Sequence, residues 1–293
     1  MTSFAIIGFG EVGGIFARDL RAGGASAINA YDIQDAARER ARAFGATVHA
    51  SAAEAAAGAD VVFICVTAGS ALAAAESLAG GLSRAPLVVD VNSVSPSAKQ
   101  SNARAVDEAG GRYVEAAVMA SVPPKGLRSP ILLGGPNALA FIDLMTPFGM
   151  DLRIYSEEIG RASAVKMCRS VMVKGLEALT TECMLAARHY GVEADVLRSL
   201  SDTLPHEDWR GLARYVMSRA LIHGKRRAEE MREVARTVEE AGVAPLLSAP
   251  IAERQDWAAA RGREMGQAQL ATTDLDVLLD GLIAAMHHRQ AAE

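Results

Sequence analysis

The stretch FAIIGFGEVGGIF (residues 4–16) decides the fold, because it joins an apolar run, a glycine-rich turn and the start of a helix. Gly8, Gly10 and Gly13 follow the GxGxxG pattern directly after the apolar run. Glycines at this spacing allow a tight turn and a close approach of the backbone to a pyrophosphate, and the next helix offers N–H donors. The alternative is a glycine-rich turn without a ligand. The predicted cofactor-binding residues of this loop are Gly8, Phe9, Gly10, Glu11, Val12 and Gly13.

An acidic residue ends the second apolar run. Asp32 closes AINAYD (27–32), nineteen residues after Gly13. A carboxylate at this place can accept hydrogen bonds from both ribose hydroxyls and repels a 2′-phosphate, so NAD is favoured over NADP as the cofactor. Arg38 lies nearby and leaves NADP possible.

The first 156 residues alternate short apolar runs with alanine-rich helical stretches. The expected strands are at residues 3–9, 26–32, 59–66, 85–92, 111–118 and 129–135. The helices expected between the early strands are at residues 12–22, 35–44, 51–57 and 70–80. Such alternation predicts a parallel sheet covered on both faces. We therefore expect an α/β fold, a Rossmann-type doubly wound parallel sheet, over residues 1–156.

Residues 157–293 show only helical patterns, which predicts an all-α C-terminal domain. A long helix at 159–190 joins the two domains and ends at Gly191, a typical helix-terminating residue. The further helices expected are at residues 193–203, 207–220, 223–241, 247–262 and 273–288.

Polar residues follow the third and fourth expected strands, where doubly wound sheets bind their ligands. Val66 and Thr67 follow the third strand and Asn92 follows the fourth, so these residues are further candidates for cofactor binding. Ser93 is a candidate for substrate binding. Cys65 is better explained as a small buried apolar residue.

Composition excludes several classes of protein. The net charge of −5 argues against a nucleic-acid or anionic-membrane surface. Neither a charged leader nor an apolar run long enough to span a bilayer is visible. Three cysteines without CxxC spacing indicate reduced thiols and no metal site. We expect a cytoplasmic protein that binds neither nucleic acid nor membrane.

Four blocks of the sequence resemble the β-hydroxyacid dehydrogenase family, which includes 3-hydroxyisobutyrate and 6-phosphogluconate dehydrogenases. The blocks are GFGEVG (8–13), DVNSVSP (90–96), EAAVMAS (115–121) with LLGGP (132–136), and IGRASAVKMCRS (159–170). The later helical part is similar to a variant branch with a divergent C-terminal domain. The resemblance implies an active site between the two domains, a small-molecule substrate and a homodimer formed through the helical half.

The fourth block is the most specific of these blocks. Gly160 and Lys166 fill the family's G-x-x-x-x-x-K pattern, which implies that Lys166 is the catalytic general acid/base. Burial in a cleft would favour the neutral amine that this chemistry needs. Helix geometry places Arg169, Ser170 and Glu177 on the same polar face as Lys166. A salt bridge between helices, from Glu177 to Arg169 or Lys174, is the structural alternative.

The substrate side departs from the family pattern. Met119 and Ala120 stand where the family carries a serine and a glycine, and Ser170 replaces an asparagine. We interpret these changes as a less polar pocket, with anion recognition moved to the helical half. The predicted substrate-binding residues are Ser93, Met119, Ala120, Ser121, Arg169, Ser170 and Lys174. The sequence assigns no role to His206, Asp208 and Trp209, which mark either a helix start or a substrate contact.

These observations predict an NAD(P)-dependent oxidoreductase that transfers a hydride between nicotinamide and a 3-hydroxy acid or a related alcohol or carbonyl compound. Two alternatives stay open. One is an imine or ketone reductase of the same architecture, which the apolar Met119 would suit. The other is a non-catalytic, dinucleotide-responsive binding protein.

Overall fold

The structure, a computed structural model, describes residues 2–290, with the backbone alone for residues 287–290. The chain forms two compact units that meet between Cys168 and Arg169. This division lies inside the long helix α8 (Arg161–Tyr190), twelve residues beyond the expected domain boundary at residue 156. The first two turns of α8 therefore belong to the sheet-containing unit.

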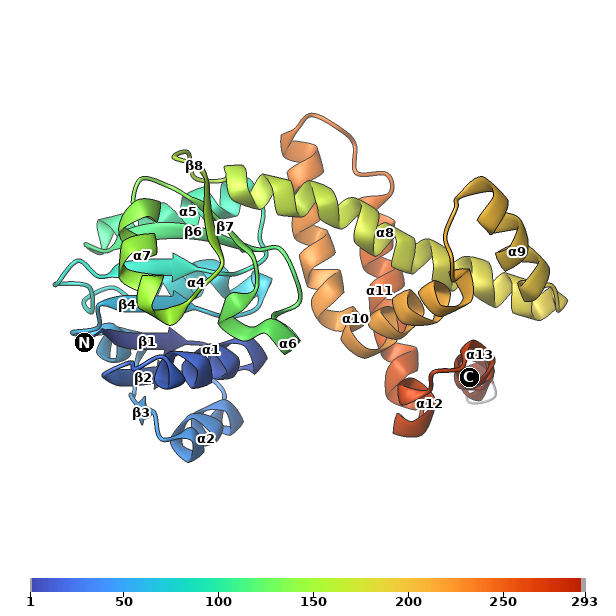
Figure 1. Ribbon diagram of the computed structural model, residues 1–293, viewed down its shortest axis with the longest axis horizontal. Helices are drawn as coiled ribbons and strands as arrows, with labels where there is room; N and C mark the ends of the chain where they lie inside the picture. Colours follow the sequence, from blue (N-terminus) through green and yellow to red (C-terminus); the bar gives the residue numbers. More distant parts are fainter. Residues whose placement is uncertain (1, 291–293) are drawn as a thin grey trace. The chain divides into compact units, whose positions relative to one another are not determined.

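One sheet of eight strands forms the centre of the first unit (Figure 1). The strands are β1 (Ser3–Ile7), β2 (Ala27–Tyr31), β3 (Thr47–Val48), β4 (Val61–Ile64), β5 (Leu87–Asp90), β6 (Arg112–Val118), β7 (Ile131–Gly134) and β8 (Leu152–Ser156). Their order is β3-β2-β1-β4-β5-β6-β7-β8. The strand order reverses at β1, which lies between β2 and β4, and this switch point is where doubly wound sheets bind ligands. The predicted α/β fold is confirmed.

Helices cover both faces of this sheet because the strands are apolar on both sides. Phe4 and Ile6 of β1 enter one core, and Ala5 and Ile7 enter the other. The helices of this unit are α1 (Glu11–Ala22), α2 (Asp35–Phe44), α3 (Ala52–Ala56), α4 (Ala71–Glu76), α5 (Pro96–Glu108), α6 (Val122–Lys125) and α7 (Ala138–Met145). Four phenylalanines pack edge-on or stacked in the first core: Phe4, Phe16, Phe63 and Phe141.

The predicted parallel sheet has one exception at β7, which runs antiparallel to β6. The connection between these strands holds only α6 and the short 3-10 helix η2 (Gly126–Arg128), too little for a helical crossover. Strand β8 was not expected either. Its side chains are exposed or half-buried along its whole length, so it lacks the apolar run that marks the other strands.

The second unit contains helices alone among its described residues. Beyond α8 they are α9 (Glu193–Thr203), α10 (Trp209–Glu240), α11 (Ser248–Glu264), α12 (Gln267–Ala271) and α13 (Leu275–Gln290). The two helices expected at 207–220 and 223–241 form the single helix α10, so that prediction was wrong. The helix continues through Gly224, whose missing side chain lets α11 approach closely: a Cβ there would lie 2.4 Å from the Gln255 carbonyl oxygen.

The apolar core of the helical unit is built from Leu and Met side chains. Its buried members include Met184, Met217, Leu221, Leu278, Leu279 and Leu282. The outer face of α8 is also apolar, since Met172 and Leu179 are 67% and 68% exposed and Leu176 lies between them. Over residues 2–290, no helix combines the length and the apolar character that crossing a bilayer requires.

Candidate active site

The three glycines of the first loop have three different structural roles. Gly8 has a φ of +95°, and a Cβ there would lie 2.4 Å from the Cys65 carbonyl oxygen. A Cβ on Gly13 would lie 2.1 Å from the Gly8 carbonyl oxygen, so this glycine lets α1 pack tightly on the loop. Gly10 faces open space, with no atom within 4 Å of a Cβ built on it. A tight turn, close helix packing and an open backbone are what a pyrophosphate site requires.

The other residues of this loop frame the start of α1. Phe9 is buried against Phe44, with ring centroids 5.9 Å apart. Glu11 is exposed in the first turn of α1, and Val12 is half-buried. No side chain caps the Gly10 end of α1, which leaves its N–H groups for an anionic ligand.

Asp32 is held firmly at the carboxyl end of β2. One carboxylate oxygen accepts the Phe9 N–H at 2.8 Å, and the other accepts the Gln34 N–H at 2.8 Å. The guanidinium of Arg38 donates to the Asp32 carbonyl oxygen at 2.7 Å and also pairs with the carboxylate of Asp35. The positive charge of Arg38 is therefore already balanced by an acidic neighbour.

Asn92 links the ends of two strands next to this loop. Its side-chain oxygen accepts the Val66 N–H at 2.9 Å, which ties the end of β4 to the end of β5. Its side-chain nitrogen is buried without a hydrogen-bond partner among the described residues, so a donor is left over at the sheet edge. Thr67 is exposed and Ser93 half-buried beside it. The predicted cofactor residues thus occupy the carboxyl ends of four adjacent strands: β2, β1, β4 and β5.

A fully buried ion pair supports this edge, and sequence reasoning missed it. Lys99 and Asp90 are both 0% exposed, and Lys99 Nζ lies 3.1 Å from one carboxylate oxygen and 2.7 Å from the Asp90 carbonyl oxygen. The other carboxylate oxygen accepts from Asn102 and from the Tyr113 hydroxyl, each at 2.8 Å. Burial alone would raise the pKa of Asp90, but Lys99 and these hydrogen bonds outweigh it and hold the pKa below its usual value.

Lys166 stands on the second turn of α8, where it is half-buried. The turn before it is attached to the sheet. Glu115 of β6 accepts the Gly160 N–H at 2.7 Å and the Ser163 N–H at 2.6 Å. Gly160 has a φ of +103°, and a Cβ there would lie 3.2 Å from Pro96 at the start of α5. The helix that carries Lys166 therefore begins beside the segment that follows Asn92 and Ser93.

The predicted substrate residues after β6 lie on the surface of the same unit. The Met119 N–H donates to the Pro130 carbonyl oxygen at 2.8 Å, and its side chain is half-buried. Ala120 and Ser121 are exposed. The Ser121 hydroxyl makes no capping bond to α6.

The predicted substrate residues of the helical unit differ in their surroundings. Arg169 is exposed. Lys174 is buried, lies 2.8 Å from a carboxylate oxygen of Glu230 and donates to the Ser170 hydroxyl at 3.3 Å. Its charge is balanced within the protein, and Arg226 pairs with the same carboxylate at 2.6 Å.

The salt bridge expected for Glu177 exists with a different partner. Glu177 pairs with Arg227 of α10 at 2.6 Å and accepts from Gln255 of α11 at 3.0 Å. Neither Arg169 nor Lys174 is its ion-pair partner among the described residues, so that part of the prediction was wrong. Burial raises the pKa of Glu177 and lowers that of Arg227, while the opposite charge of each partner opposes both shifts.

The segment around His206 forms the N-terminal end of helix α10. Asp208 accepts the Gly211 N–H at 2.7 Å and caps α10, and the His206 ring nitrogen accepts the Asp208 N–H at 3.1 Å. Trp209 donates to the Leu204 carbonyl oxygen at 2.8 Å. These local bonds account for all three residues without a substrate.

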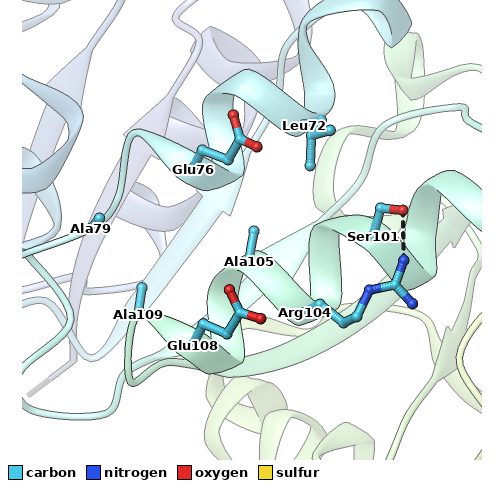
Figure 2. Close-up of a pocket in the computed structure, with 8 residues that line it drawn as sticks. All are labelled: Leu72, Glu76, Ala79, Ser101, Arg104, Ala105, Glu108 and Ala109. Carbon is cyan, nitrogen blue, oxygen red and sulfur yellow. Dashed lines mark hydrogen bonds between the residues drawn. The ribbon is translucent and has the colours of Figure 1, made fainter.

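A shallow pocket of about 460 Å³ lies away from these residues, between α4 and α5 (Figure 2). Glu76 of α4 and Glu108 of α5 are among its lining residues, together with Ala105 and Ala109. Arg104 bonds to Ser101 beside it at 3.0 Å. None of the predicted site residues lines this pocket.

Residues 3–140 match the family described as the NAD binding domain of 6-phosphogluconate dehydrogenase, and residues 187–258 match the domain of unknown function DUF1932. A conserved hypothetical protein from Sinorhizobium meliloti 1021 is 37% identical, with a TM-score of 0.70 over 96% of each chain. MTH1747, a conserved protein described as structurally similar to 3-hydroxyacid dehydrogenases, is 32% identical, with a TM-score of 0.69 over 89% of this chain and 98% of its own.

The 3-hydroxyisobutyrate dehydrogenase of Mycobacterium tuberculosis, solved with L-serine, shares the fold. It is 18% identical, with a TM-score of 0.72 over 88% of this chain and 94% of its own. The matches above 30% identity extend over nearly the whole chain, through both units. The chain therefore belongs to the 3-hydroxyacid dehydrogenase-like proteins that join the NAD binding domain of 6-phosphogluconate dehydrogenase to the domain DUF1932.

Proposed function

We propose that this protein is an NAD-dependent dehydrogenase or reductase that acts on a small 3-hydroxy acid or a related carbonyl compound, with Lys166 exchanging the proton. One observation carries the proposal: the helix with Lys166 starts against Pro96, immediately after the strand end that holds Asn92, in the same compact unit as the open glycine loop. An amine and a dinucleotide site in one unit are the two parts that hydride transfer needs.

The residues present fit a dinucleotide. Gly10 leaves room for a pyrophosphate, the start of α1 offers N–H groups, and Asp32 is the proposed partner of the ribose hydroxyls. The nicotinamide cofactor, when bound, supplies or accepts the hydride. Lys166 takes the proton from the substrate hydroxyl, or returns one to a carbonyl in the opposite direction. Ser93 and the segment from Met119 to Ser121 are the proposed substrate contacts.

A cofactor-binding variant and a substrate screen test this proposal. Gly10→Ala should fold normally, because a Cβ meets nothing there, but it should bind the dinucleotide about tenfold more weakly (~1.4 kcal/mol), since the methyl group occupies the pyrophosphate space. Gly266→Ala in the helical unit is the matched control. Binding is measured by calorimetry, and turnover by absorbance of the reduced cofactor with 3-hydroxy acids, including L-serine, and with ketones and imines in the reverse direction.

The outcomes separate the candidate functions. Turnover of hydroxy acids supports the proposal, whereas turnover of imines alone assigns the protein to imine reduction. Dinucleotide binding without turnover of any substrate would identify a binding protein. Equal affinity of Gly10→Ala and the parent protein would contradict the dinucleotide site itself.

We expect NAD to bind at least about tenfold more tightly than NADP. The Asp32 carboxylate repels a 2′-phosphate, and Arg38 is occupied by Asp35 and the Asp32 carbonyl. Asp32→Ser should reduce this preference, because the variant should bind NAD more weakly and NADP more tightly than the parent protein does. Parallel titrations of both proteins with both cofactors measure the change, and tighter binding of NADP by the parent protein would refute the argument.

A further inference from the structure

Glu115 is a buried carboxylate that has no ion-pair partner among the described residues, although both of its oxygens accept hydrogen bonds. The side chain is 0% exposed, and its two oxygens accept the Gly160 and Ser163 N–H groups at 2.7 and 2.6 Å. Such charge-assisted bonds are about twice as strong as neutral ones. The positive end of the dipole of α8 adds to them, because both donors lie at the start of this 30-residue helix.

The sheet holds this carboxylate in one orientation. Glu115 stands opposite Gly134 in the antiparallel register of β6 and β7. A Cβ on Gly134 would lie 2.3 Å from the carboxylate oxygen that binds Gly160, so the glycine makes the space that the carboxylate fills. Any larger residue at position 134 would push the carboxylate away from the helix.

The Ser163 N–H that donates to Glu115 lies about one helical turn before Lys166. Ser163 and Lys166 are three residues apart on α8 and are therefore neighbours on its surface, about 5–6 Å apart at Cβ. The left-handed backbone of Gly160 and its contact with Pro96 fix the same turn from the other side. The position of the amine therefore depends on the two N–H bonds to Glu115.

We infer that Glu115 is the positioning residue for Lys166, which it places through the first turn of α8; the inference rests on the proposed function. A displacement of about 1 Å in a reacting group can lower a rate on the order of 100-fold. Glu115 touches neither substrate nor cofactor in this role. It acts by fixing the part of the backbone from which the Lys166 side chain extends.

Glu115→Gln tests the inference, because the amide has the same size but turns an NH2 group toward one of the two N–H donors. We expect kcat to fall about 10- to 100-fold with the affinity for NAD unchanged. Amide hydrogen exchange at Gly160 and Ser163 should quicken about tenfold or more, while α10 keeps its protection. If Glu115→Gln fails to fold, Glu115→Asp takes its place: it keeps the charge but is one methylene shorter, so it should show a smaller fall in kcat together with faster exchange at Gly160 and Ser163.

Glu193→Gln is the matched control, because Glu193 is also buried and bonded, to Arg188 at the far end of α8. It should lower thermal stability and leave kcat unchanged. Faster exchange at Gly160 and Ser163 in Glu115→Gln with an unchanged kcat would overturn the inference, as would unchanged exchange. If the parent protein turns over no substrate, the proposed function fails separately. The rate at which an acylating reagent modifies Lys166 then tests the inference. A rate in Glu115→Gln that differs from that of the parent protein supports a positioning role for Glu115, and an equal rate overturns it.

Discussion

Lys166→Ala should lower turnover by about 100- to 10,000-fold, the usual contribution of a general acid or base, while NAD binds as before. The reason is that the alanine can neither accept nor return a proton, whereas the glycine loop and Asp32 are untouched by the change. Lys166→Arg sharpens the test. It keeps the positive charge but cannot give up a proton near neutral pH, so it should be nearly as inactive as the alanine variant.

Steady-state rates and NAD titrations of the three proteins measure this effect. Lys225→Ala is the control, because Lys225 is an exposed lysine of α10 and its removal should leave turnover unchanged. A structural role for Lys166 predicts the opposite pattern, in which the melting temperature falls and kcat stays the same. Full activity of Lys166→Arg would show that the charge, and not the proton, matters.

Lys99→Met should cost about 3–5 kcal/mol of the free energy of unfolding at neutral pH. Lys99 and Asp90 are both fully buried, so the variant leaves a carboxylate without its counter-charge inside the sheet unit. Urea denaturation measures the loss, with Lys225→Met as the control. Adding Asp90→Leu should restore only part of the stability, because Asn102 and Tyr113 then lose the oxygen that they bond.

The pH dependence of this variant has a definite sign. In the parent protein the pKa of Asp90 is held below its usual value, so the stabilisation from its charge is present above the unfolded pKa near 3.8 and is lost as pH falls below it. Without Lys99, the largest effect that lowers the pKa of Asp90 is gone, so this pKa should be higher in the folded variant than in the folded parent protein. The stability difference between the two proteins should therefore shrink as the solution is acidified. A difference that stays constant well below pH 3.8 would contradict the buried ion pair.

The nucleotide loop could be predicted from the sequence because its determinants are local. Gly8, Gly10 and Gly13 act within one turn of chain, and their backbone requirements are visible in their spacing. Asp32 is one strand and one helix away at a characteristic distance. The direction of β7 was not predictable in this way, because apolar strands look the same in either direction.

Side-chain partners that lie far apart in the chain were also not predicted from the sequence. Glu177 could have paired with any cation one or two turns away on α8, and only the packing of α10 selects Arg227, fifty residues later. The division of α10 into two expected helices was wrong, and the close contact of Gly224 with α11 has no local signature in the sequence. Glu115 did leave a signal: a charged residue in the middle of RYVEAAV must find donors if that strand is buried.

The bare apolar ridge formed by Met172, Leu176 and Leu179 has a practical consequence for every assay above. Exposed apolar side chains of this kind favour association, and the homodimer that the family resemblance implies stays a prediction. Specific activity should therefore be compared across a dilution series, with sedimentation run at the same concentrations. A rate per chain that falls as the solution becomes more dilute would mean that a lone subunit is not the working species.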